Sequence, residues 1–360
     1  MHSANPKCVQ IQIQICGNCS FSKLSPKWFL ALYTIVLCCL APLRPLWLDE
    51  VIQLSDTYHH DLLDTINLVA HNPGGVPLTY IVQNLFVNVI DYPFYAARLL
   101  SVLWAFAAMS SLIWLARLLD IAWLPVALCY ALLPISLRYA LEIRQYGPAM
   151  AFSIAATALL VRLDREPSPR RAVLYACVLT LGLYSHPYFA FVVIAHALWA
   201  LRRTSAKYAL PACAASGLLF LPWFLIARVY WTQAVVQGHF QSAFTWKTPL
   251  MIPHELSGGG YLLTCSFLAL AAYGYWRSPL STSAKQLLLL CILVPLPLVM
   301  FANILFRYFF AIRQLVFIVP PLSILAAEGV RAFPKRLAAT LSAVLVLFAL
   351  YSDFRWFHQP

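Results

Sequence analysis

The sequence has 360 residues, of which 62% are hydrophobic and only 11% are charged. A soluble domain has roughly 45–50% apolar and about 25% charged residues, so the composition excludes an ordinary soluble protein. The aromatic share of 14% suits a chain with many membrane–water boundaries, where Trp and Tyr are enriched. We therefore expect an all-α, polytopic transmembrane helix bundle that is embedded in a lipid bilayer.

The net charge of +12 has a topological explanation. Basic residues gather in short linkers, around 162–171, 202–207 and 331–336. Such a bias marks the cytoplasmic ends of membrane helices and binds no partner by itself. We expect no nucleic-acid partner, and a multi-pass protein whose compact length suits the inner (plasma) membrane of a bacterium.

In chain order, the pattern predicts a cytoplasmic tail (1–27), a transmembrane domain (28–353) of about 11 or 12 spans, and a C-terminal tail (354–360). The candidate spans lie near 28–43, 76–91, 97–116, 121–140, 146–161, 172–186, 187–201, 208–228, 259–276, 286–304, 309–327 and 337–353. Basic linkers placed in the cytoplasm put both ends of 76–91 outside, so we expect that segment to be re-entrant or interfacial.

The first outer loop, 44–75, is expected to carry short juxtamembrane helices and contains five of the 13 acidic residues. Its Asp49 and Glu50 follow the first span directly. An ionised pair at a membrane face is costly unless it is solvated or partnered, so it marks a candidate site. A base that takes a proton from a hydroxyl is a carboxylate or histidine, and Asp49 suits that role. The pair could instead only solvate the loop and favour the start of a helix.

The same topology places further polar residues on the outer face. They are His71, Arg98, Arg144, Tyr146, His186 and Arg307. Arginines beside a carboxylate base could grip an anionic leaving group, as in a transferase site. The simpler alternative is that the arginines snorkel at interfaces and that His71 caps a turn. A later outer loop, 229–258, either covers the acceptor side or anchors the interface through its aromatic residues.

Six short motifs follow one another along the chain. They are WLDE (47–50), HNPGGVPLTY (71–80), YAARLLSVLWAF (95–106), LEIRQYGPAM (141–150), YSHPYF (184–189) and RYFF…VPP (307–321). Together they resemble the GT-C superfamily of polyprenyl-phosphate-sugar-dependent glycosyltransferases. The resemblance is to the family 39-like branch, which includes protein O-mannosyltransferases and the lipid A aminoarabinose transferase.

The resemblance implies that Asp49 is the catalytic base. Glu50 would support it, or the two carboxylates would hold a divalent metal ion as cofactor. The implied residues around the donor phosphate are Arg98, Arg144, Tyr146 and Arg307, and the implied substrate-binding residues are His71 and His186.

The expected reaction is inverting transfer of a hexosyl or pentosyl group from a polyprenyl-phosphate sugar donor to a hydroxyl acceptor. The acceptor is a protein, lipid or glycan, and the site faces the periplasm or exterior. A transporter or flippase of a lipid-linked anion shares the arginines, but it predicts charges at the bilayer midplane and often a repeat. A non-catalytic membrane assembly protein would tolerate Asp49→Asn.

Overall fold

The computed structural model describes residues 25–72, 74–236, 251, 254–255, 260–306 and 312–358. Every regular element in these ranges is helical, which confirms the predicted all-α bundle. The α-helices are α1 (Pro26–Leu40), α2 (Leu48–Ser55), α3 (Leu62–His71), α4 (Pro77–Val87), α5 (Pro93–Leu118), α6 (Trp123–Ala131), α7 (Pro134–Leu141), α8 (Tyr146–Arg165), α9 (Pro169–Ser185), α10 (Ala190–Ala200), α11 (Ala206–Val236), α13 (Tyr261–Arg277), α14 (Thr282–Leu293), α15 (Pro295–Phe306), α16 (Val319–Arg331) and α17 (Lys335–Phe357). Short 3-10 turns cover Ala41–Leu43, Pro187–Phe189 and Ile312–Ile318.

Within the described ranges, seven helices are long and apolar enough to cross a membrane, or up to eight if one bent pair is counted. The seven are Pro26–Leu43, Pro93–Leu118, Tyr146–Arg165, Ala206–Tyr230, Thr282–Ala302, Arg313–Arg331 and Lys335–Phe357. The bent pair is α6 and α7, which meet at 72°.

This number is lower than the 11 or so predicted spans because four apolar segments form short helices. The segments 76–91, 172–186, 187–201 and 259–276 give α4, α9, α10 and α13, of 11, 17, 11 and 17 residues. A straight span needs about 17–25 residues, so α4 and α10 are too short for a straight crossing and α9 and α13 lie at the lower limit. The length of α4 in particular excludes a straight crossing by 76–91.

The break predicted at His186-Pro187 is present between α9 and α10. His186 is extended, with φ −159° and ψ 127°, as the residue before a proline prefers. Gly182 lets the chain fold back closely, because a Cβ there would lie 2.3 Å from the ring of Phe189. The break turns His186 into the interior.

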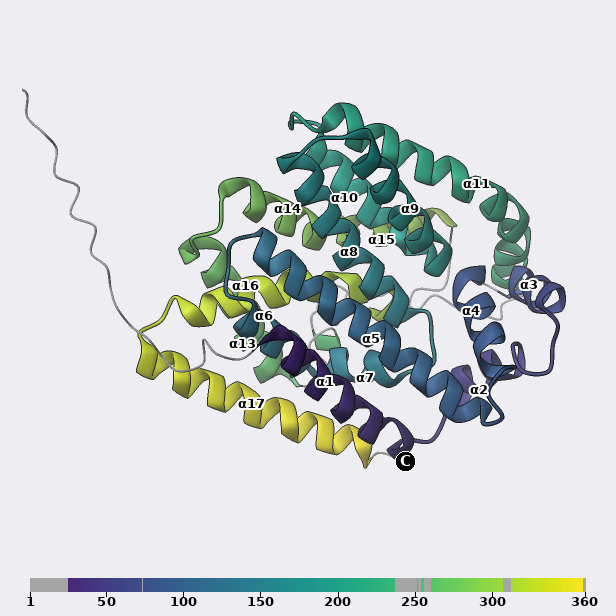
Figure 1. Ribbon diagram of the computed structural model, residues 1–360, viewed down its shortest axis with the longest axis horizontal. Helices are drawn as coiled ribbons and strands as arrows, with labels where there is room; N and C mark the ends of the chain where they lie inside the picture. The colour runs from purple at the N-terminus through teal and green to yellow at the C-terminus, as the bar shows by residue number, and fades with distance from the viewer. Residues whose placement is uncertain are drawn as a thin grey trace, which may run out of the picture.

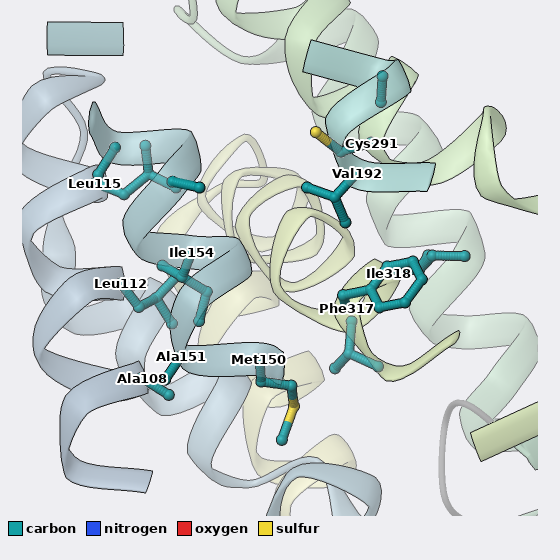
Figure 2. Close-up of a cluster of buried hydrophobic side chains, with 14 of the residues drawn as sticks. Ala108, Leu112, Leu115, Met150, Ala151, Ile154, Val192, Cys291, Phe317 and Ile318 are labelled. Atoms are coloured by element: carbon teal, nitrogen blue, oxygen red, sulfur yellow. The ribbon is translucent and has the colours of Figure 1, made fainter. Parts of the chain in front are cut away.

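Side chains from several helices meet in the centre of the bundle (Figure 2). The labelled residues are Ala108, Leu112 and Leu115 of α5, Met150, Ala151 and Ile154 of α8, Val192 of α10, Cys291 of α14, and Phe317 and Ile318. Small residues such as Ala108 and Ala151 allow two helix backbones to approach closely, which favours packing inside a membrane. The core therefore fixes α5 and α8 against each other, and both carry site residues at their ends.

Two glycines face each other where α13 crosses α16. A Cβ on Gly274 would lie 1.9 Å from the carbonyl oxygen of Leu325, and one on Gly329 would lie 2.0 Å from that of Leu270. No other residue fits at either position without moving a helix. The close contact with α13 holds α16 inside the bundle, together with the Ile312–Ile318 turn that precedes it.

The C-terminal ends of α1 and α17 meet at one edge of the bundle. Figure 1 shows α17 running along this edge, with its C-terminal end beside the end of α1. Trp356 and Phe357 pack against a small buried cluster that includes Leu37 of α1. At the far end of the bundle, α2, α3 and α4 pack together next to the start of α5 (Figure 1).

Candidate active site

Asp49 and Glu50 lie in the first turn of α2, where the chain leaves the first apolar helix. The Glu50 carboxylate accepts a hydrogen bond from the backbone N–H of Trp47 at 3.2 Å, which closes the start of the helix. Carboxylates are favourable there because unpaired N–H groups and the helix dipole give the N-terminus a partial positive charge. Local sequence therefore explains why the acidic pair begins a helix.

Glu50 is buried, with 1% of its surface exposed, and forms an ion pair with Arg98, which is 2% exposed. The shortest distance, from Arg98 Nη1 to Glu50 Oε1, is 2.6 Å. The same oxygen accepts from the backbone N–H of Ile143 at 2.7 Å. Arg98 also donates to the backbone carbonyls of Arg44, Pro45 and Leu141. The ion pair and these hydrogen bonds make two buried charges tolerable, and they join the loop 44–75, α5 and the turn before α8.

Asp49 points to a different partner and is more open. Its Oδ2 accepts from Arg313 Nη2 at 2.9 Å, and the two side chains are 28% and 30% exposed. The Arg313 guanidinium also lies over the ring of Trp47, 4.9 Å from its centroid. No described residue donates to Asp49 Oδ1. Within the described residues, one oxygen of Asp49 is therefore held by a cation and the other has no hydrogen-bond donor.

Arg313 was not among the residues predicted from the sequence. The predicted arginine of this segment was Arg307, which lies outside the described residues. A signal was present, since Arg313 interrupts the apolar run 309–327 and has no acidic residue near it in sequence. A lone arginine in such a run needs a partner from elsewhere in the fold, and here that partner is Asp49.

Arg144 reaches the same site from the turn between α7 and α8. Its Nη1 lies 3.4 Å from the backbone oxygen of Asp49 and 3.3 Å from Oε1 of Gln53. Tyr146 follows it, and its ring lies 4.7 Å from that of Tyr139. The structure thus brings together Asp49, Arg144 and Tyr146, as the topology predicted, and adds Arg313.

Glu142 is a second carboxylate of the site to which the sequence reasoning assigned no role. Its pKa is raised to about 8, chiefly by burial and also by the negative charge of Glu50, while the charges of Arg144 and Arg313 oppose the rise. One of its oxygens, Oε1, is buried without a hydrogen-bond partner among the described residues. Its place next to an arginine in LEIRQY was the signal in the sequence.

His186 lies beneath Tyr146, with ring centroids 5.9 Å apart, and is 1% exposed. Burial lowers its pKa to about 3, and the positive charge of Arg144 acts in the same direction. Its Nδ1 accepts from the backbone N–H of Tyr188 at 3.2 Å. The imidazole is therefore neutral and carries its proton on Nε2, which is buried without a partner in the described part of the chain.

His71 lies apart from this cluster in its contacts. It is exposed at the end of α3, its Nδ1 is 2.7 Å from the backbone oxygen of Asn67, and its ring lies 4.1 Å from that of Tyr230 on α11. The neighbouring Asn72 donates to Asp56 at 3.0 Å. Burial raises the pKa of Asp56, and the charge of Arg144 is near enough to oppose that effect.

Most of the later outer loop, 229–258, lies outside the described residues. Glu255 is described, and burial raises its pKa while the charges of His254, Arg313 and Arg138 oppose the rise. This part of the loop therefore comes close to the cation that pairs with Asp49.

The two carboxylates that were expected to hold a divalent metal ion face in different directions. Both oxygens of Glu50 are engaged by Arg98 and by backbone N–H groups, and Asp49 is paired with Arg313. No group of three or more His, Cys, Asp or Glu side chains in the described ranges is placed to hold a metal. In this arrangement the residues do not fit a metal shared by Asp49 and Glu50, because Glu50 would first have to leave its ion pair.

Comparison with solved structures shows that the chain shares its fold with two kinds of glycosyltransferase. The archaeal oligosaccharyltransferase AglB from Archaeoglobus fulgidus, in complex with an inhibitory peptide and a dolichol-phosphate, matches 92% of this chain with a TM-score of 0.56 at 10% identity. The oligosaccharyltransferase of the same organism in complex with Zn and sulfate matches 92% with a TM-score of 0.58 at 10% identity. Arabinofuranosyltransferase AftD from mycobacteria matches 92% with a TM-score of 0.53 at 18% identity.

The likeness covers only part of these larger proteins. The chain spans 55% and 52% of the two oligosaccharyltransferase chains and 26% of AftD. No protein-family model and no curated protein matches the chain by sequence. At these identities the comparison establishes the fold, which is the fold that the resemblance implied.

Proposed function

We propose that this protein is a membrane glycosyltransferase that moves a sugar from a polyprenyl-phosphate donor to a hydroxyl acceptor, with inversion. The observation that carries the proposal is the half-open Asp49–Arg313 pair, with Arg144 beside it, in a GT-C fold. The dolichol-phosphate and peptide bound to the archaeal neighbour support a lipid-linked donor. We place the site in the domain 28–353, facing the periplasm or exterior of a bacterial inner membrane.

In the proposed step, Asp49 Oδ1 takes the proton of the acceptor hydroxyl as its oxygen attacks C1 of the sugar. The bond between C1 and the phosphate oxygen breaks, and the phosphate leaves with the electron pair. Negative charge therefore grows on the phosphate oxygens in the transition state. Guanidinium groups fixed nearby stabilise that charge without reorganising, and Arg144 and Arg313 are the two that approach Asp49.

We assign Arg98 and Glu50 a positioning role instead of direct contact with the donor. The two charged groups pair with each other and with backbone groups, and both side chains are buried. The pair holds the turn of α2 that bears Asp49 against the turn that bears Arg144. Tyr146 and His186 line the floor of the site, where the neutral imidazole of His186 has an N–H to donate to the substrate.

The test is sugar transfer from radiolabelled polyprenyl-phosphate sugars in membranes that contain wild type or Asp49→Asn at matched expression. We expect the variant to lose about 10²–10⁴-fold in rate, which is what a general base contributes. Asp64→Asn is the matched control, because Asp64 is also in the first turn of a helix in the same loop but lies on α3. Equal transfer by wild type and Asp49→Asn would exclude Asp49 as the base.

A further inference from the structure

Two cavities lie against the inner side of α17 and share Leu263 as a wall. The first has a volume of about 440 Å³ and lies between α17 and the helices α6, α13 and α16. The second has a volume of about 370 Å³ and lies at the C-terminal end of α17, next to Arg138 and the start of α13. Together they form one groove along the last helix, which we call the α17 groove.

The α17 groove changes from apolar to polar along its length. In the first cavity α17 contributes Ala338, Ala339, Ser342, Leu345, Val346 and Ala349. The facing helices contribute five leucines and other apolar residues, and their one charged residue there, Arg331, is paired with Glu328. The second cavity is lined by two arginines, Arg138 and Arg355, and by the hydroxyl groups of Tyr351 and Ser352. The lining of α17 runs from 338 to 356, which at 1.5 Å per residue is about 27 Å, close to the ~30 Å hydrocarbon thickness of a bilayer.

The polar end of the groove lies on the side of the candidate active site. Arg138 is next to Tyr139, whose ring packs 4.7 Å from that of Tyr146. The carboxylate of Glu255 lies close enough to Arg138 and Arg313 for both positive charges to lower its pKa. A ligand whose head lies at Arg138 therefore has that head close to the cation that pairs with Asp49.

We propose that the α17 groove binds the lipid-linked phosphate donor, with the hydrocarbon chain along α17 and the phosphate held first at Arg138 and Arg355, from where it would reach Arg144 and Arg313 for transfer. The inference rests on the proposed function and adds the place where the donor lies. Asp353 faces Arg138 and offsets part of its charge, so the phosphate gains most from Arg355 together with the hydroxyl groups. An anionic head with a long apolar chain fits both ends of the groove, whereas a free sugar or an ion fits neither the length nor the apolar lining.

The direct test is binding of polyprenyl phosphate to the purified full-length protein, measured without any transfer reaction. Ser342→Trp fills the apolar cavity, and we expect it to weaken binding at least tenfold. Ala339→Phe is a milder filling variant with the same expected direction. Val344→Trp is the matched control, because Val344 is exposed on the opposite face of α17 from the lining residues and should leave binding unchanged. Equal binding by wild type, Ser342→Trp and Ala339→Phe would overturn the proposal.

The head group is tested with competitors and with Arg138→Gln and Arg355→Gln. We expect each variant to bind polyprenyl phosphate more weakly while binding of the uncharged polyprenol stays the same. Inorganic phosphate alone should not displace the lipid, and phosphatidylglycerol should do so only weakly. Equal displacement by phosphatidylglycerol would show a groove for bulk lipid and overturn the assignment.

Donor binding tests the α17 groove, and sugar transfer tests the proposed function, so the two proposals can fail separately. Asp49→Asn should bind polyprenyl phosphate like wild type although it transfers no sugar. If wild type transfers sugar but Ser342→Trp binds the donor normally, the α17 groove is not the donor site, and the proposed glycosyltransferase function is unaffected. If polyprenyl phosphate binds in the groove but no sugar donor gives transfer, the assignment of glycosyltransferase function is wrong, and the assignment of the binding site is unaffected.

Discussion

The Arg98 guanidinium and the Glu50 carboxylate lie 2.6 Å apart in the interior, between the loop that bears Asp49 and the turn that bears Arg144. The acidic pair Asp49-Glu50 is therefore divided between two tasks. Glu50 points into the interior and anchors the loop through its ion pair with Arg98, whereas Asp49 points towards Arg313 and remains partly exposed. Neighbouring carboxylates at the start of one helix differ in role because they point to different partners.

The first prediction concerns stability. Glu50→Ala should destabilise the protein by about 3–5 kcal/mol, because it leaves Arg98 buried without its counter-ion. The measurement is the thermal unfolding midpoint of the purified protein in detergent. Glu166→Ala is the control, since Glu166 is 56% exposed in its pair with Arg171 and such pairs are worth about 0–1 kcal/mol. Similar losses in both variants would contradict a structural role for Glu50.

The second prediction concerns the residue that the structure adds to the site. Arg313→Gln should lower sugar transfer by about 10²–10³-fold, which is the usual loss when one donor to a developing negative charge is removed. Arg313→Lys keeps the charge but loses the two-pronged geometry, and we expect intermediate activity. Arg277→Gln, at the end of α13, serves as a control for loss of an arginine. Full activity in Arg313→Gln would remove Arg313 from the mechanism.

The third prediction follows from Glu142, whose pKa is raised from 4.5 to about 8. Between these values the folded protein binds more protons than the unfolded chain, so the contribution of Glu142 to stability falls as pH rises. Below about pH 4.5 that contribution is complete, and above about pH 8 it is lost. Glu142→Gln cannot titrate, so its thermal midpoint should fall less than that of wild type between pH 5 and pH 9. Parallel pH profiles would show that Glu142 is not the group responsible.

The fourth prediction tests the crossing of α13 and α16. Gly274→Ala should destabilise by about 1–3 kcal/mol, because the new Cβ would meet a backbone oxygen that cannot move alone. Gly217→Ala on α11 is the matched control, since a Cβ there meets nothing within 4 Å. In a helix that substitution should be neutral or stabilise by up to about 1 kcal/mol. Thermal midpoints of the two variants should therefore move in opposite directions or differ clearly in size.

The sequence predicted the all-α membrane bundle and the GT-C fold because composition and short motifs depend on local residues. It also predicted that Asp49, Arg144 and Tyr146 would share a face, since topology alone decides on which side each helix ends. It predicted 11 or 12 spans, more than the seven or eight long apolar helices of the described residues, because apolar runs such as 172–186 do not reveal where a helix will end inside the bundle.

The sequence did not predict which acidic side chain pairs with which arginine. Glu50 and Arg98 are 48 positions apart, and Asp49 and Arg313 are 264 positions apart. Only packing decides which arginine meets which carboxylate. Arg98 resembled a donor-phosphate ligand by its place in a motif, and the fold instead buries it beside Glu50.

The contact between Arg44 and Trp356 has a consequence for how the protein is made. Arg44 lies over the Trp356 ring, 4.5 Å from its centroid, and donates to the Trp356 carbonyl oxygen, while its own carbonyl accepts from Arg98. Trp356 is near the end of α17 and lies 312 positions along the chain from Arg44. The loop that bears Asp49 therefore gains this contact only once α17 has been made and packed, so a chain cut short before α17 would hold its acidic loop without it.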